Sequence, residues 1–151
     1  MSIPFLLLLL CLPTTILAGA YDIFVFNTTI FCGHTRRFSY TLSYNIRSDN
    51  PDRPIELDEI ADSKGTSDPG LLHLLVRGFY DYSLSKIPVY EPVVKITHTC
   101  FTKGQTGRKI LKVNLPTTPI RRAKIECTYS FYVDITNKEG DMDDTALIKC
   151  D

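Results

Sequence analysis

In RRFSYTLSYNI (residues 36–46), apolar and polar side chains alternate from one residue to the next after Arg37. The side chains that share the apolar side are Phe38, Tyr40, Leu42, Tyr44 and Ile46. Successive side chains of an extended chain point to opposite sides, so this pattern is typical of a strand with one buried face. KIECTYSFYVDIT (residues 124–136) repeats the pattern, with apolar side chains at every odd position from Ile125 to Ile135. A strand that is apolar on one face needs a second layer to cover it.

Further strands are expected in five other stretches, which begin near Asp22, Gly70, Glu91, Gly107 and Thr145. Runs rich in Gly, Pro, Asn, Asp and Ser separate them and favour turns, among them DSKGTSDPG (residues 62–70) and LPTTP (residues 115–119). The acidic stretch from Ser48 to Gly70 reads as connections around one short edge strand near residues 55–60, and it lacks the residue spacing of a calcium-binding loop. Seven or eight short strands without a helical stripe predict an all-β fold of two packed antiparallel sheets.

The first twenty residues carry no charged side chain and have an apolar run from Ile3 to Leu12. Small residues at Ala18 and Ala20 form an A-x-A cleavage pattern, so residues 1–20 are interpreted as a signal peptide and residues 21–151 as one secreted, extracellular domain. Pro13 interrupts the run well short of the roughly 20 residues that a membrane span needs. The chain has 17 basic and 17 acidic residues, a balance that argues against a nucleic-acid partner.

Secretion decides how the cysteines and one sequon are interpreted. Four of the five cysteines remain after the signal peptide with Cys11 is removed, and an even number in an exported chain predicts two disulfides. These cysteines are Cys32, Cys100, Cys127 and Cys150, and three pairings are open. Asn27-Thr28-Thr29 is an N-glycosylation sequon, which requires Asn27 to face solvent.

EPVVKITHTC (residues 91–100) places His98 and Cys100 on the same side of a strand as Val94 and Ile96. A nucleophilic thiol beside an imidazole is one interpretation. Oxidation of Cys100 in an exported domain is the preferred one, which leaves His98 as a structural imidazole that hydrogen-bonds loop backbone. The histidines have no ligand spacing typical of zinc, so neither a metal, nor a cofactor, nor a catalytic residue is predicted.

Basic pairs and aromatic loop residues are the candidates for binding. Two separate pairs of neighbouring arginines have planar guanidinium donors suited to an anionic head group or to carboxylates. GFYDYS (residues 78–83) places Tyr80 and Tyr82 in an expected loop, where tyrosines often mark a binding surface. The candidates are Arg36, Arg37, Arg121, Arg122, Tyr80 and Tyr82, with a solvated loop or ordinary packing as the alternative.

Four parts of the chain carry a family resemblance: VFNTTIFCGHTRRFSYTLSYNI (residues 25–46), ELDEIADSKG (56–65) followed by LLHLLVRG (71–78), EPVVKITHTC (91–100) followed by RKILKVNLP (108–116), and IKCD (148–151). They resemble the opening strands with Cys-Gly, the acidic loop, the His-x-Cys strand and the terminal Cys of the nematode transthyretin-like family of small secreted proteins. The resemblance implies a transthyretin-like β-sandwich. A further cysteine that the family has after His-x-Cys is missing between Phe101 and Glu126, so the family's disulfide pairing does not transfer.

The resemblance also implies extracellular binding without catalysis, with a cell-surface, host or other protein partner. A carrier of a small apolar ligand or lipid is the alternative. A hydrolase related to 5-hydroxyisourate hydrolase is a further alternative, but that enzyme ends in Tyr-Arg-Gly-Ser and this chain ends in LIKCD. Neither the partner nor the oligomeric state follows from the sequence.

Overall fold

The computed structural model describes residues 21–34, 37–48, 56–68, 70–81, 89–102, 104–119 and 124–151. The predicted signal peptide lies outside these residues. Within them the chain forms β-strands and no helix. The strands are β1 (Tyr21–Phe31), β2 (Phe38–Ser48), β3 (Glu56–Ser67), β4 (Leu71–Asp81), β5 (Val89–His98), β6 (Lys109–Asn114), β7 (Thr118–Pro119), β8 (Glu126–Asp134), β9 (Gly140–Asp143) and β10 (Leu147–Cys150). No helix long and apolar enough to span a membrane occurs in the described ranges.

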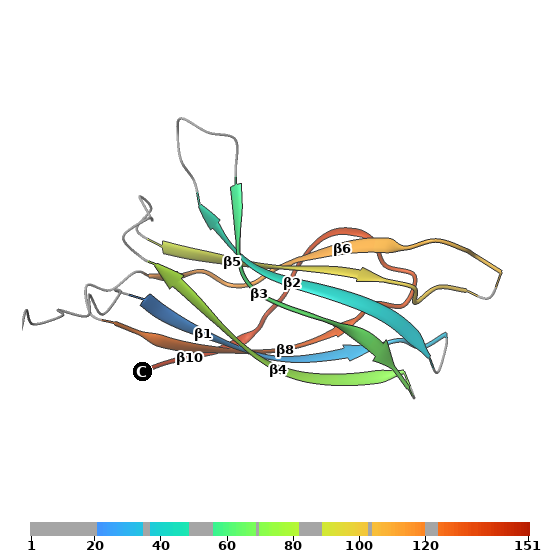
Figure 1. Ribbon diagram of the computed structural model, residues 1–151, viewed down its shortest axis with the longest axis horizontal. Helices are drawn as coiled ribbons and strands as arrows, with labels where there is room; N and C mark the ends of the chain where they lie inside the picture. Colours follow the sequence, from blue (N-terminus) through green and yellow to red (C-terminus); the bar gives the residue numbers. More distant parts are fainter. Residues whose placement is uncertain are drawn as a thin grey trace, which may run out of the picture.

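Two sheets lie face to face as two layers (Figure 1). The four-stranded sheet has the order β10-β8-β1-β4, and the six-stranded sheet has the order β3-β2-β5-β6-β9 with β7 paired to β5. The all-β prediction with two sheets is therefore confirmed, although the described residues form ten strands instead of seven or eight. The prediction of wholly antiparallel sheets is wrong, because β1 pairs with β8 and β6 pairs with β9 in parallel. Parallel neighbours need long crossovers, and both pairs join strands far apart in sequence.

The acidic stretch before residue 70 departs most from its prediction. It forms the long strand β3, which pairs with β2 from Phe38↔Ser67 to Ser48↔Glu56 with one register shift. The polar composition suits an edge strand, whose outward side chains face water while its backbone bonds to a single neighbour. The Asp-Ser-Lys-Gly run predicted as a turn therefore lies inside a strand. LPTTP, also predicted as a turn, contains the two-residue strand β7.

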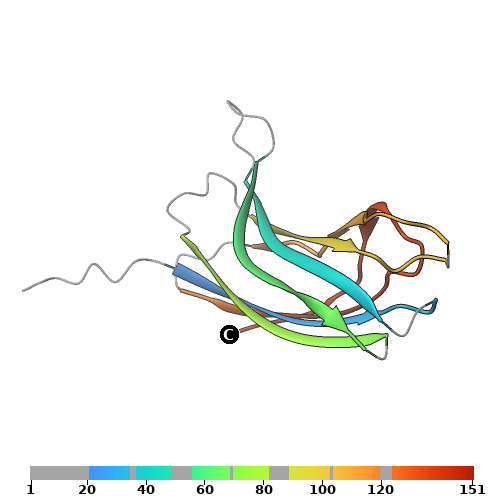
Figure 2. The ribbon, with the colours of Figure 1, turned by 45° about the vertical axis from the view of Figure 1, so that its right-hand side comes forward.

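The chain passes from the six-stranded to the four-stranded sheet between β3 and β4, which run side by side along one flank (Figure 2). Their close approach depends on Gly78 in β4, because a Cβ atom there would lie 2.9 Å from Cγ1 of Ile60. A larger residue at this position would separate the strands. This contact closes one side of the space between the sheets.

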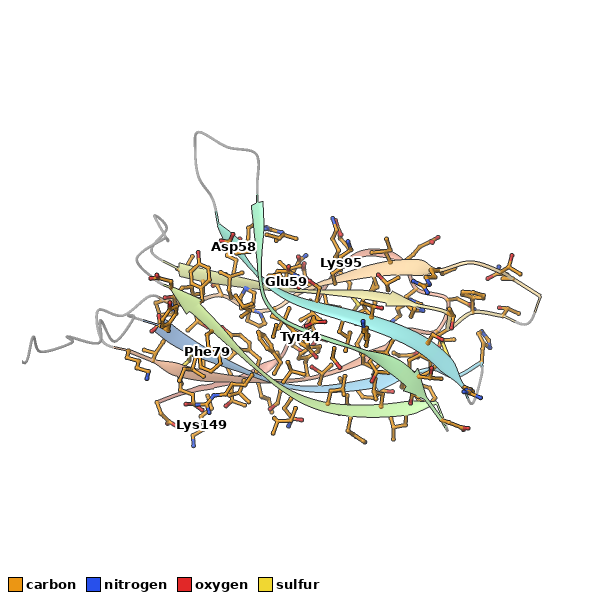
Figure 3. All side chains as sticks on the ribbon, viewed as in Figure 1. Tyr44, Asp58, Glu59, Phe79, Lys95 and Lys149 are labelled. Carbon is orange, nitrogen blue, oxygen red and sulfur yellow. A yellow bond between two sulfur atoms is a disulfide. The ribbon has the colours of Figure 1, made fainter. Side chains whose placement is uncertain are left out.

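Aromatic rings fill the interior between the sheets. The Phe26 ring stacks on Tyr44 from the facing sheet at 4.6 Å between centroids and on Tyr129 of its own sheet at 5.8 Å. Tyr44 lies between the layers, whereas Lys95 and Lys149 point away from them on opposite sides (Figure 3). The apolar faces predicted for residues 38–46 and 125–135 point inward, with Tyr40 the one partly exposed member. The inward direction of Val94 and Ile96 is likewise confirmed.

Buried tyrosine hydroxyls link the two layers. The Tyr44 hydroxyl in β2 hydrogen-bonds Thr28 in β1 at 3.1 Å, and the Tyr129 hydroxyl in β8 bonds Thr118 in β7. Burial raises the pKa of both Tyr44 and Tyr129 to about 12, since an ionised phenol loses its hydration there. A hydroxyl buried without a partner would cost about 1–3 kcal/mol, so these pairs fix how the sheets sit on each other.

Candidate binding surface

The cysteine pairing is settled by the geometry. Cys32 follows β1 and Cys100 follows β5, and their disulfide, with Cα atoms 5.8 Å apart, joins the two sheets. Cys127 in β8 and Cys150 in β10 are directly opposed in neighbouring strands and form the second disulfide. The prediction of two disulfides is confirmed. These sulfurs are consumed in covalent bonds and are not nucleophiles.

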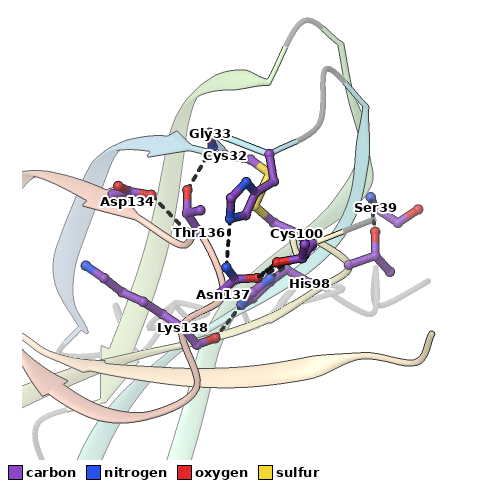
Figure 4. The surroundings of a disulfide bond; sticks show 12 residues. Cys32, Gly33, Ser39, His98, Cys100, Asp134, Thr136, Asn137 and Lys138 are labelled. Atoms are coloured by element: carbon purple, nitrogen blue, oxygen red, sulfur yellow. Dashed lines mark hydrogen bonds between the residues drawn. A yellow bond between two sulfur atoms is a disulfide. The ribbon is translucent and has the colours of Figure 1, made fainter. Parts of the chain in front are cut away.

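His98 has a structural role beside the first disulfide (Figure 4). The Cys100 backbone N–H donates to Nδ1 of His98 at 3.1 Å, so the ring carries its proton on Nε2 and donates it to the Lys138 carbonyl at 3.0 Å. Burial lowers the pKa of His98, because the imidazolium would lose its hydration. The prediction of a structural imidazole bonded to loop backbone is confirmed, and both ring nitrogens are occupied.

The other two histidines lie on different elements with different partners. His34, after β1, bonds the Asn137 side chain at 2.7 Å, and His73 in β4 bonds Thr29 at 2.9 Å. Among the described residues, no group of three or more His, Cys, Asp or Glu side chains is arranged to hold a metal ion.

The predicted binding residues are not brought together by the described structure. Arg36, Arg121, Arg122 and Tyr82 lie outside the described residues. Arg37 is exposed just before β2. Tyr80 lies in β4 and not in a loop, and only 3% of its surface is exposed. The suggestion that Tyr80 belongs to a loop-tip binding surface is therefore wrong: its ring meets Tyr90 edge-on and its hydroxyl donates to Asp58.

The outward side of the four-stranded sheet carries large apolar side chains, which sequence reasoning missed. We define the outer apolar face by the exposed side chains Tyr21, Phe31, Leu71, Leu75, Phe79, Tyr132 and Leu147. The strand registers place them on one side, since Phe31 opposes Leu71 and Ser130 opposes Leu147. Exposure is greatest at Leu147 (79%) and Leu75 (75%). Charged side chains lie among them on the same side, including the exposed Arg77–Glu126 ion pair and Lys149. Exposed apolar side chains rimmed by polar ones often mark an interaction site.

A sequence signal for this face does exist. LLHLLV (residues 71–76) and ALI (residues 146–148) place apolar side chains at consecutive positions, so both faces of these strands are apolar. Strands of that kind are typical of sheets covered on both sides. In the described structure the inner side of β4 is partly buried against the core and the outer side is exposed.

The outward side of the six-stranded sheet is different in character. Its exposed residues include Ser39 and Thr41 in β2, Lys95 in β5 and Lys112 in β6. Ile110 is an isolated exposed apolar residue there, paired across the sheet with Thr97. Hydroxyl and ammonium groups keep their hydration on such a surface. The described residues of this side expose only two large apolar side chains, Leu57 and Ile110.

Depressions on the surface of the described residues include ones of 320, 270 and 390 Å³, and charged side chains line each of these. The first contains the Arg47–Glu91 ion pair, the second Lys64 and Arg108, and the third Lys109 with Glu139. A pocket for an apolar ligand is lined predominantly by apolar side chains. These depressions do not have that lining.

Asn27 is exposed and lies within the outer apolar face, in the central strand β1. Leu75 opposes it on β4 and Ser130 opposes it on β8. The requirement that Asn27 face solvent is therefore met. The sequon lies in the middle of β1. The sequence alone did not predict that Asn27 would lie among exposed apolar side chains.

Comparisons with known proteins return no match: no protein-family model, no curated protein and no solved structure is similar to this chain.

Proposed function

We propose that this protein is a secreted extracellular binding protein without catalytic activity, and that it contacts a protein partner through the outer apolar face. The observation that carries the proposal is the exposure of seven large apolar side chains on one side of the four-stranded sheet. Burying a leucine or phenylalanine side chain is worth about 1.5–3 kcal/mol, so covering this face would stabilise a complex. The partner is a cell-surface, host or other extracellular protein.

Secretion is supported by the two disulfides and by the expected signal peptide in residues 1–20. Disulfides persist in oxidising compartments and are rare in the cytosol. The proposal extends to the fold family: two sheets face to face, linked by Cys32 and Cys100, suit a transthyretin-like β-sandwich of the nematode secreted type. The resemblance of the sequence motifs supports this assignment.

Binding at a surface is favoured over the alternatives. A carrier of an apolar ligand would need a cavity between the sheets, where the rings of Phe24, Phe26, Tyr44 and Tyr129 are packed together. A hydrolase would need an imidazole able to exchange protons with a substrate. Both nitrogens of His98 are instead engaged by backbone groups, and His34 and His73 lie on separate elements and bond the side chains of Asn137 and Thr29.

A binding experiment with matched variants tests the proposal. Leu75→Lys combined with Leu147→Lys places two charges on the outer apolar face, and Ile110→Lys places one on the opposite side of the molecule at a residue that is also exposed. With the wild type and the variants prepared without a glycan on Asn27, we expect the double variant to lose at least tenfold in binding to cells or to extracellular proteins. Ile110→Lys should bind like the wild type. Equal binding by all three proteins would contradict the proposal.

A further inference from the structure

Asn27 lies in a row of residues that crosses the whole four-stranded sheet. Leu75 of β4 and Ser130 of β8 oppose Asn27, and Leu147 of β10 opposes Ser130. Neighbouring strands are about 4.8 Å apart, so Leu75 lies one strand spacing from Asn27 and Leu147 two spacings away on the other side. The two most exposed leucines of the outer apolar face therefore flank the sequon asparagine.

The sequon itself is oriented by the alternation of β1. Thr28 points inward, where it is fully buried and bonds the Tyr44 hydroxyl. Asn27 and Thr29 consequently share the outward side. Thr29 opposes Tyr132 of β8, so an aromatic ring of the outer apolar face stands beside the sequon as well.

We propose that an N-linked oligosaccharide on Asn27 covers the outer apolar face. The donor is an oligosaccharide on a polyprenol diphosphate. The side-chain amide nitrogen of Asn27 forms a bond to C1 of the first sugar and loses a proton, while the C1–O bond to phosphate breaks and the diphosphate leaves with the electron pair. The attached sugars then extend from the centre of the face over Leu75 and toward Leu147.

The chemistry of the face suits a sugar. One side of a pyranose ring presents C–H groups that pack on aromatic and aliphatic side chains, and Tyr132 and Leu75 are of this kind. The hydroxyls at the ring edge need polar partners, and Ser130 and Thr128 of β8 lie on the same side with partly exposed side chains. A glycan can therefore lie along this sheet and remove apolar surface from water.

Timing decides how many copies carry the glycan. In the folded chain β1 is paired along its length with β4 and with β8, so its backbone is held extended on both sides. Transfer to Asn27 therefore precedes the pairing of β1, and it competes with folding. Copies that fold first keep the face open. This part rests on the proposed function: only copies without the glycan bind the protein partner through the outer apolar face.

The test uses the full chain with its leader, secreted from cultured eukaryotic cells. Asn27→Gln and Thr29→Ala both remove the sequon, whereas Thr29→Ser keeps it. Peptide mass analysis reports the glycan, fluorescence of an apolar dye reports the open face, and sedimentation reports self-association. We expect a glycan on Asn27 of the wild type and of Thr29→Ser, and at least threefold more dye fluorescence from Asn27→Gln and Thr29→Ala.

Adding Leu75→Lys and Leu147→Lys to Asn27→Gln should return dye fluorescence to the level of the glycoprotein. If the variants lacking the sequon are not secreted, trimming the wild-type glycan to one sugar with an endoglycosidase should raise dye fluorescence by itself. Absence of a glycan at Asn27 in the secreted protein would overturn the inference. So would equal dye fluorescence of the wild-type glycoprotein and Asn27→Gln.

Partner binding separates the two proposals. If Asn27→Gln binds dye but no cell or protein partner, the proposed function fails and the glycan inference stands. If the glycoprotein and Asn27→Gln bind a partner equally well, the glycan does not close the face, and binding remains supported.

Discussion

The two disulfides of this protein hold different kinds of neighbours. Cys32–Cys100 joins the ends of β1 and β5 from separate sheets, and both residues are buried. Cys127–Cys150 joins adjacent strands of one sheet, and Cys150 at the end of the edge strand β10 is partly exposed. The first bond holds the layers together, whereas the second holds an edge strand in place. One disulfide therefore stabilises the packing between the sheets, and the other stabilises the edge of one sheet.

At the end of the molecule opposite Cys32, the two sheets are joined by hydrogen bonds, because the disulfide at that end, Cys127–Cys150, lies within one sheet. Asp22, near the start of β1, is fully buried and accepts hydrogen bonds from the Tyr90 hydroxyl and from the Ile125 backbone N–H. Tyr90 belongs to the facing sheet. A buried carboxylate with two donors thus does at one end what the disulfide does at the other.

Removing the bond between the sheets should have the largest effect. The Cys32→Ala/Cys100→Ala variant frees a segment with a sequence separation of 68 residues. Loop-closure entropy predicts a loss of about 4 kcal/mol in the free energy of unfolding. Urea denaturation of the oxidised protein measures it. A smaller loss than in the Cys127→Ala/Cys150→Ala variant would show that the bond between layers is not the dominant one.

The Cys127→Ala/Cys150→Ala variant frees a shorter segment, with a sequence separation of 23 residues. The same entropy relation predicts a loss of about 3 kcal/mol. Because Cys150 is partly exposed and Cys32 and Cys100 are buried, a soluble phosphine should reduce Cys127–Cys150 first. Timed alkylation followed by peptide mapping reports the order. Simultaneous loss of both bonds would mean that reduction requires global unfolding.

The contact between the sheets at the Asp22 end is tested by Asp22→Ala. This change leaves the Tyr90 hydroxyl and the Ile125 N–H without their buried acceptor, and we expect a loss of about 2 kcal/mol in the free energy of unfolding. Asp62→Ala, at an exposed position in β3, is the control and should change stability by less than about 0.5 kcal/mol. Equal losses of stability from the two changes would show that the hydrogen bonds of Asp22 do not stabilise the contact between the sheets.

The smallest expected effect is the change in folding stability with pH that is caused by His98, which lies beside the Cys32–Cys100 bond. The pKa of His98 in the folded chain is lowered below the unfolded value of 6.5, mainly by burial, with Lys109 lowering it further and Glu139 and the Lys138 carbonyl opposing. The unfolded chain therefore binds a proton first as the pH falls, so folded-state stability is full above pH 6.5 and decreases below it. Urea midpoints at pH 7.5 and 5.5 should differ more for the wild type than for His98→Gln. An equal shift of the urea midpoint between the two pH values in the wild type and in His98→Gln would contradict this prediction.

Much of the interior could be predicted from local pattern. Period-two alternation identified the buried faces of residues 38–46 and 125–135, and it placed His98 and Cys100 inward beside Val94 and Ile96. The edge strand predicted near residues 55–60 is present as the start of β3, but its extension to Ser67 was missed, because the polar side chains of an edge strand carry no alternation and resemble a loop. Local pattern also failed for Tyr80, which a short Gly-Phe-Tyr-Asp sequence suggested to be a loop residue.

The sequence by itself determined that the chain is all-β, that its four cysteines outside the predicted signal peptide form two disulfides, and which side chains face inward in the most regular strands. Those properties depend on residues near one another in the chain. Only the tertiary structure decided the disulfide pairing, the parallel neighbours β1 and β8, and the gathering of Leu75, Asn27 and Leu147 on one surface. The physical reason is that strand order and register are set by which edges meet, and no local alternation of side chains encodes that choice.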